Sequence, residues 1–233
     1  ENGIIDHPKF GKIIAFEGID GCGKSTQCNR SFHYVSAGGE KAIMVKEPNK
    51  EVLGGKLIYG LLFGDGPIGF SDMSSRQRQG HYFWNRLLHY KEIVIPALEK
   101  GINILSDRCF ASVSLDVHQP GDLEKLLAIQ DYFFEKEEIP LIRPDLIIIL
   151  DLKPEVAIER LSKKDEQKRD FFEHAGKMLQ TMIAYQEFAA KFPDFCRLVE
   201  ASPSDPDTVF IHIRELLHQN FELQGWKKKG EEK

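Results

Sequence analysis

The sequence predicts an α/β fold of three layers, in which helices cover both faces of a parallel central sheet. Strand-length apolar runs alternate with helical segments along the 233-residue chain. The runs are apolar at successive positions, as in "LIIILDL" (146–152), rather than at every second position. Such runs are typical of strands that helices bury on both faces, and strands of this kind pair in parallel.

Each expected strand is rich in apolar residues and is bounded by turn-forming or charged residues. The second run ends at Glu47 and Pro48, and the third ends at Asp107. Parallel strands bring their carboxyl ends to one edge, where ligands bind in sheets of this type. The expected strands are 12–17, 41–48, 102–107, 144–152 and 196–201.

Helices are predicted between these strands. Gly38 and Gly39 stop the first one, and the long third helix is expected to kink at Pro96. A Gly, Pro and Ser-rich loop (64–75) precedes that helix, and a charged stretch (163–169) interrupts the fifth. The expected helices are 25–39, 54–64, 75–101, 121–138, 153–192 and 205–221.

The composition and charge of the chain exclude several classes of function. With 42% hydrophobic and 29% charged residues, the chain resembles soluble globular proteins, and we expect one domain over 1–233 with flexible ends at 1–10 and 225–233. A net charge of -5 gives no general attraction to nucleic acid or to membranes, and no apolar run approaches the roughly 20 residues that span a bilayer. We expect no signal peptide. The four cysteines show no metal-binding spacing, which favours free thiols in the cytoplasm.

A phosphate-binding motif follows the first expected strand. "GIDGCGKSTQ" (18–27) has the spacing Gly-x-x-x-x-Gly-Lys-Ser of a P-loop. Its glycines let backbone N–H groups form an anion-binding nest, and the following helix adds its positive end. Lys24 is expected to reach the phosphates and Ser25 to ligate Mg²⁺. The motif therefore predicts a P-loop NTPase fold.

Two further clusters suit phosphoryl transfer, which needs cations around the moving group and a carboxylate for the metal. Asp107 can serve Mg²⁺, and Arg108 can hold an acceptor phosphate, or the two can form a structural ion pair at the strand end. The run "RLSKKDEQKR" (160–169) is either a solvated helix face or a lid that closes over the phosphates. We expect a short helical lid at about 160–173.

The sequence resembles thymidylate kinases, in the nucleoside monophosphate kinase superfamily. Matching pieces occur in the family's order over nearly the whole chain: "FEGIDGCGKSTQ", "KEP", "HYFWNR", "IPALEKG", "SDR", "RPDLIIILDLKPEVAIERL" and "VEASPS". The resemblance implies transfer of the ATP γ-phosphate to dTMP, with Mg²⁺, in a homodimer that pairs through helices around 51–63 and 82–90. The alternatives are a kinase for another pyrimidine or modified monophosphate, and a regulator without transfer activity.

The resemblance also implies residue roles. Lys24, Arg108, Lys164 and Arg169 would be catalytic, and the last two are the expected lid cations because Cys22 leaves the loop without an arginine. Asp20, Ser25 and Asp107 would bind Mg²⁺. The implied donor-phosphate site is Gly18, Ile19, Asp20, Gly21, Cys22, Gly23, Lys24, Ser25 and Thr26. The implied acceptor site is Asp20, Glu47, Pro48, Tyr82, Phe83, Arg86, Arg108, Ser112 and Asp116.

Within the acceptor site, Arg86 would bind the base and Tyr82, less so Phe83, would stack on it. Either aromatic ring can instead be ordinary helix core. The sequence departs from the family at "EPNK", at Cys109, in "KRDFFE", and at Asp116, where the family has an aromatic residue beside the sugar. Asp116 can accept a hydrogen bond from a sugar hydroxyl, or it can cap a helix or meet solvent while Leu115 or Val117 faces the site.

Overall fold

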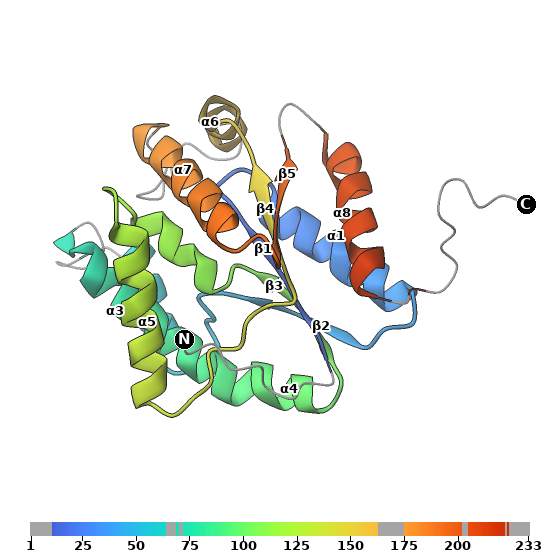
Figure 1. The fold of residues 1–233 in the computed structure, drawn as a ribbon, viewed down its shortest axis with the longest axis horizontal. Helices are drawn as coiled ribbons and strands as arrows, with labels where there is room; N and C mark the ends of the chain where they lie inside the picture. Colours follow the sequence, from blue (N-terminus) through green and yellow to red (C-terminus); the bar gives the residue numbers. More distant parts are fainter. Residues whose placement is uncertain are drawn as a thin grey trace, which may run out of the picture.

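The parallel sheet is confirmed. The computed structural model describes residues 11–63, 69, 72–162, 175–201, 205–221 and 223. Its five strands all pair in parallel, in the order β2-β3-β1-β4-β5 (Figure 1). They are β1 (Ile13–Glu17), β2 (Ala42–Lys46), β3 (Asn103–Asp107), β4 (Leu146–Asp151) and β5 (Cys196–Glu200).

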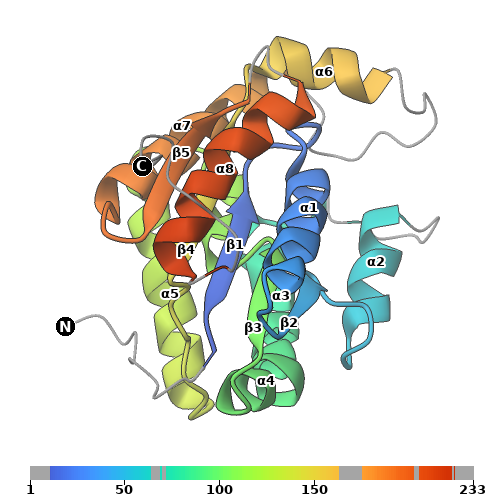
Figure 2. The same cartoon turned by 90° about the vertical axis from the view of Figure 1, so that its right-hand side faces the viewer.

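Helices cover both faces of the sheet, as expected of the α/β/α arrangement. Figures 1 and 2 show α1 and α8 on one face and α3, α4, α5 and α7 on the other. The described helices are α1 (Lys24–Ala37), α2 (Gly55–Phe63), α3 (Ser75–His89), α4 (Ile95–Glu99), α5 (Asp122–Lys136), α6 (Pro154–Ser162), α7 (Ala175–Lys191) and α8 (Pro206–Asn220).

The core has two halves because successive residues of a strand point to opposite faces of the sheet. In β1, Ile13 and Ala15 pack with residues from α3, α5 and α7. Ile14 and Phe16 pack on the other side, with residues from α1 and α8. All five residues of β1 are buried, which explains the uninterrupted apolar run from Ile13 to Phe16.

The long third helix differs from the prediction. Helix α3 ends at His89, a π-helical segment η2 (Tyr90–Val94) follows, and α4 begins at Ile95. Pro96 therefore lies in the first turn of α4, directly after the π-helical segment. The wider π turn makes room for the proline ring, so the irregularity lies before Pro96 rather than at it.

The carboxyl ends of the strands meet at one edge of the sheet. Phe16 of β1 is in register with Asp107 of β3 and with Ile148 of β4, and Lys46 of β2 is in register with Asp107. The segments that follow β1, β2 and β3 thus begin side by side. None of the helices in the described ranges is long and apolar enough to cross a membrane.

Candidate active site

The phosphate loop joins β1 to α1, and its glycines adopt backbone conformations that other residues rarely reach. Gly18 has φ +133° and Gly23 has φ +100°. A side chain at Gly18 would meet the carbonyl oxygen of Leu150 at 2.8 Å, so this position requires glycine. The surroundings of Gly23 are open, and α1 begins at the next residue. The loop can therefore admit an anion to the helix N-terminus.

Lys24 lies across this loop, with its side chain nearly buried. Its Nζ donates to the carbonyl oxygens of Gly18 and Ile19 at 3.0 and 2.9 Å, and lies 3.3 Å from Oδ1 of Asp20. These contacts hold the ammonium group inside the loop, where it can meet the phosphates of a bound nucleotide.

A carboxylate and a hydroxyl adjoin the loop. Ser25 Oγ donates to Oδ2 of Asp107 at 2.5 Å, and Lys46 Nζ lies 3.8 Å from the same oxygen. The other oxygen of Asp107, Oδ1, is buried and has no hydrogen-bond partner among the described residues. A hydroxyl beside a carboxylate with an unused oxygen fits Mg²⁺, which prefers oxygen ligands and is often held by one carboxylate, phosphates and water. Among the described residues, no group of three or more acidic, His or Cys side chains is arranged so that it could hold a metal ion by itself.

Arg108 follows β3 directly and is held over the phosphate loop. Its Nη2 lies 2.6 Å from Oδ1 of Asp20, and its Nη1 lies 3.6 Å from Oε2 of Glu17. Burial would lower the pKa of the guanidinium, but the charges around it, Asp20 foremost, hold it well above its usual value. Burial likewise opposes ionisation of Asp20, yet Lys24 and Arg108 lower the pKa of this carboxyl to about 2. The pair is therefore charged at neutral pH.

Sequence reasoning missed Glu17 at the end of β1, which supports this arginine. Its carboxylate accepts hydrogen bonds from Cys109 N at 2.8 Å, Ser112 Oγ at 2.7 Å and Tyr185 Oη at 2.7 Å. Burial raises the pKa of Glu17, while Arg108 and these hydrogen bonds act in the opposite direction. Glu17 belongs to the family piece "FEGIDGCGKSTQ", but its partners lie more than 90 residues away, so no local pattern could reveal them.

Two adjoining hollows meet at Arg108. The smaller, about 170 Å³, lies over the phosphate loop and is lined by Lys24, Ser25, Thr26 and Asp107 among others. The larger, about 340 Å³, lies between the strand ends and α3. Both hollows share a further set of lining residues, which are Asp20, Gly21, Lys46, Arg108 and Leu161. A group bound in one hollow can thus lie next to a group bound in the other.

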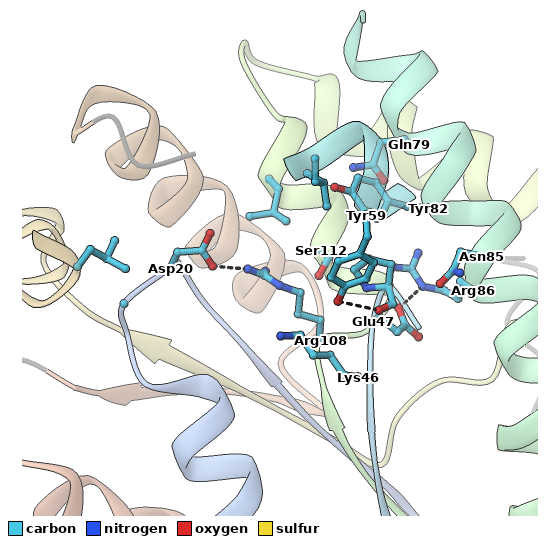
Figure 3. A pocket seen from close by; sticks show the side chains of 15 residues that line it. Asp20, Lys46, Glu47, Tyr59, Gln79, Tyr82, Asn85, Arg86, Arg108 and Ser112 are labelled. Carbon is cyan, nitrogen blue, oxygen red and sulfur yellow. Dashed lines mark hydrogen bonds and ion pairs between the residues drawn. The ribbon is translucent and has the colours of Figure 1, made fainter. Parts of the chain in front are cut away.

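Helix α3 supplies one wall of the larger hollow, which we call the acceptor pocket. Tyr82 lines it, and so does Arg86, one turn further along the helix (Figure 3). Arg86 Nε donates to Glu47 Oε2 at 2.6 Å, and its Nη2 donates to the carbonyl oxygen of Cys109 at 2.9 Å. Burial opposes ionisation of Glu47, but Arg86 and His89 keep the pKa of this carboxyl below its usual value. Arg86, which the resemblance implies would bind the base, is therefore fixed in direction by a buried acid.

The structure brings most predicted acceptor residues together. Glu47, Pro48, Tyr82 and Ser112 line the pocket with Asp20, Arg86 and Arg108. Phe83 is instead buried in the core, where its ring packs against Phe133. Lining residues that sequence reasoning missed are Lys46, Tyr59, Leu62, Gln79, Asn85 and Leu161. The predicted lid cations, Lys164 and Arg169, lie outside the described residues, as do both expected tails.

Asp116 is placed differently from both expectations for it. It ends the 3₁₀ segment η3 (Phe110–Asp116) and is fully buried, so it neither meets solvent nor caps a helix. Arg78 Nε donates to its Oδ1 at 2.7 Å, and Gln79 Nε2 donates to its Oδ2 at 2.7 Å. Leu115, rather than Asp116, lines the acceptor pocket, and this part of the second expectation is confirmed. The expected direct contact between Asp116 and a sugar is therefore wrong, because Asp116 contacts Arg78 and Gln79 of α3 instead.

Comparisons with known proteins agree with this geometry. The family model described as thymidylate kinase matches residues 16–210. A protein named thymidylate kinase from Jannaschia sp. (strain CCS1) is 33% identical over 210 residues, which cover 89% of this chain and 96% of that protein. A protein of the same name from Bifidobacterium longum (strain DJO10A) is 33% identical over 197 residues, covering 83% and 91%. Another, from Mesoplasma florum, is 30% identical over 219 residues, covering 93% and 98%.

Proposed function

Because this chain belongs to the thymidylate kinase family, we propose that it transfers the γ-phosphoryl group of ATP to dTMP. A phosphate oxygen of dTMP attacks the γ-phosphorus, the bond from that phosphorus to the β–γ bridging oxygen breaks, and dTDP and ADP leave. The pair of hollows that meet at Asp20 and Arg108 carries the proposal. A switch or motor needs a nucleotide site alone, whereas a kinase needs a second pocket that opens onto the phosphates.

The chain's own residues divide the work between the two hollows. Lys24 holds the β- and γ-phosphates of ATP and offsets charge that builds up during transfer. On the acceptor side, Arg108 holds the monophosphate of dTMP, and Arg86 and Tyr82 hold its base. Substrates fixed in this way react as neighbours, so much of the rate enhancement comes from positioning. The lid cations Lys164 and Arg169 remain part of the proposal on family resemblance alone.

We include Mg²⁺ in the proposal. Ser25 and Asp107 would hold it, because their oxygens lie together and Oδ1 of Asp107 is buried without a partner among the described residues. Asp20 is the third expected ligand, although Arg108 and Lys24 bind its carboxylate in the structure. The ion supplies positive charge beside the β- and γ-phosphates.

The proposal extends to a homodimer acting in the cytoplasm. Three large apolar side chains are exposed on or next to α2 and on α3, which supports pairing through these helices: Leu53, Leu57 and Trp84. Figure 2 shows α2 at the outer edge of the molecule. The four cysteines are all buried as free thiols, which suits a reducing compartment.

A coupled assay of ADP release tests the proposed function. Purified chain, ATP, Mg²⁺ and either dTMP, dUMP, UMP or CMP are combined in turn. We expect dTMP to give the largest kcat/KM. A larger kcat/KM for another monophosphate would still show a nucleoside monophosphate kinase, but one with a different substrate. ADP release that no monophosphate stimulates would contradict the proposal.

A further inference from the structure

We propose that Asp116 fixes the side-chain amide of Gln79 so that its oxygen, Oε1, faces the acceptor pocket. Gln79 then acts as a hydrogen-bond acceptor that selects nucleotides carrying a hydrogen-bond donor at this place. In this account Gln79 is the specificity-determining residue and Asp116 is a positioning residue behind it. The inference rests on the proposed function, since it assigns the pocket to the acceptor nucleotide.

The orientation of the amide follows from its partner. Gln79 Nε2 lies 2.7 Å from Oδ2 of Asp116. A carboxylate can only accept hydrogen bonds, so the NH₂ end of the amide, rather than its oxygen, must face Asp116. The two polar ends of an amide diverge, and Gln79 lines the acceptor pocket whereas Asp116 does not. Oε1 is therefore the polar atom that Gln79 can present to a ligand.

Arg78 keeps Asp116 in this acceptor role. Both Nε and Nη2 of Arg78 donate to Oδ1 of Asp116, the first at 2.7 Å, and the pair is buried. A guanidinium has only donors, so the Asp116 oxygen that it contacts must accept its hydrogen bonds. Because Arg78 uses Oδ1, the other oxygen is left for Gln79. The buried Arg78–Asp116 pair thus orients the side-chain amide of Gln79 and does not itself contact the ligand.

The position of Gln79 on α3 decides what it meets. Gln79, Tyr82 and Arg86 follow one another at helical spacings of three and four, so they share the face of α3 that forms the pocket wall. Figure 3 shows all three extending from this helix toward the pocket. A base stacked on Tyr82 and bound by Arg86 therefore lies within the neighbourhood of Gln79.

Two parts of a pyrimidine nucleotide can supply the required hydrogen-bond donor. One is the ring N3–H of a keto pyrimidine such as thymine or uracil, which cytosine lacks. The other is a sugar hydroxyl. Gln79 is only 1% exposed, so an Oε1 that meets no donor in the complex would be buried without a partner. Such a loss disfavours the wrong nucleotide by roughly tenfold or more.

The Gln79→Leu substitution removes the acceptor and leaves the Arg78–Asp116 pair in place. We would measure kcat/KM for dUMP, dCMP and UMP with wild type, with Gln79→Leu, and with Gln180→Leu on the exposed surface of α7 as control. If N3–H is the donor, Gln79→Leu lowers the dUMP/dCMP ratio about tenfold. If the 2′-hydroxyl is the donor, it lowers the UMP/dUMP ratio instead. Equal losses for all three nucleotides, or no loss, would overturn the inference.

The role of Asp116 is tested by combining substitutions. Asp116→Asn lets either end of the Gln79 amide face the pocket, so it should reduce the same ratio in the wild-type background and leave the ratio unchanged in the Gln79→Leu background. An equal change of the ratio in both backgrounds would show that Asp116 does not act through Gln79. If Asp116→Asn does not fold, the ratios for Gln79→Leu still decide the specificity role.

The failure of the inference can be told apart from the failure of the proposed function. Wild type that phosphorylates no monophosphate would refute both together. Active wild type, with kcat/KM ratios that Gln79→Leu leaves unchanged, would refute the inference alone.

Discussion

Nη2 of Arg108 lies 2.6 Å from Oδ1 of Asp20, which ties the residue after β3 to the phosphate loop after β1. Arg108 has φ +80°, a left-handed conformation that costs a non-glycine residue free energy. Its contacts with Asp20, Glu17 and Tyr185 hold it there. The guanidinium is thus positioned before any phosphate binds, at the place where the two hollows meet.

Arg108→Lys should weaken binding of the acceptor more than binding of ATP. Lysine keeps the charge but cannot make the two parallel hydrogen bonds that a guanidinium makes with a phosphate. We expect the KM for dTMP to rise about tenfold or more, with a small change in the KM for ATP. Steady-state kinetics with each substrate varied in turn would show this, with Arg197→Lys on the exposed side of β5 as control. Equal effects on both KM values would place Arg108 on the donor side or in a structural role.

Lys24→Ala should abolish transfer while leaving the chain folded. The Lys24 side chain contacts loop carbonyl oxygens rather than the apolar core, so the substitution mainly removes a positive charge beside the phosphates. Removing one such group typically costs ~10²–10³ in rate. Lys41→Ala, an exposed lysine just before β2, is the control. Turnover above roughly a tenth of wild type would refute the P-loop assignment.

The stability difference between wild type and Asp20→Asn should depend on pH. Burial opposes ionisation of Asp20, but Lys24 and Arg108 lower its pKa to about 2 from the ordinary value of 3.8. A carboxyl with a depressed pKa stabilises the fold above its unfolded pKa and loses that contribution as pH falls through the folded pKa. Above pH 4, we expect the free energy of unfolding of wild type to exceed that of the variant by roughly 2 kcal/mol. This difference should shrink as the pH falls toward 2. Urea unfolding across this range would measure it, and a gap independent of pH would contradict the charge pairing.

The exposed apolar residues near α2 and on α3 should mediate dimer formation. Leu57 is 58% exposed and Trp84 is 42% exposed. Leu57→Asp should therefore give a monomer in light scattering, whereas Ile211→Asp, at a 49% exposed apolar residue of α8, should not. Wild type that has the 26.6 kDa mass of one chain at micromolar concentration would rule out the dimer.

The sequence allowed the sheet and phosphate loop to be predicted because their signals are local. Each buried strand carries its own apolar run, and the loop's glycine spacing follows from the backbone conformations at Gly18 and Gly23. The end of α3 was predicted less well, since a proline signals an irregularity without specifying whether it is a kink or a π turn.

The acceptor pocket shows where local patterns stop being informative. Tyr82 and Arg86 were predicted on one helix face, but Gln79 was overlooked because an isolated glutamine carries no signal of its own. The aligned position of Asp116 suggested a contact with the sugar, with a helix cap or solvent as the alternative. Its partners in the structure, Arg78 and Gln79, lie 38 and 37 residues earlier in the chain. A contact of that length depends on how η3 packs against α3, which only the folded structure gives.

Direct detection of dTDP tests the central claim most directly. The chain would be incubated with ATP labelled in the γ-phosphate, Mg²⁺ and dTMP, and the products separated chromatographically, with Lys24→Ala prepared in parallel. The account predicts that the label moves into the β-phosphate of dTDP with wild type and that Lys24→Ala forms at least ~10²-fold less of this product per unit time. Release of the label as inorganic phosphate, with no labelled dTDP, would contradict it.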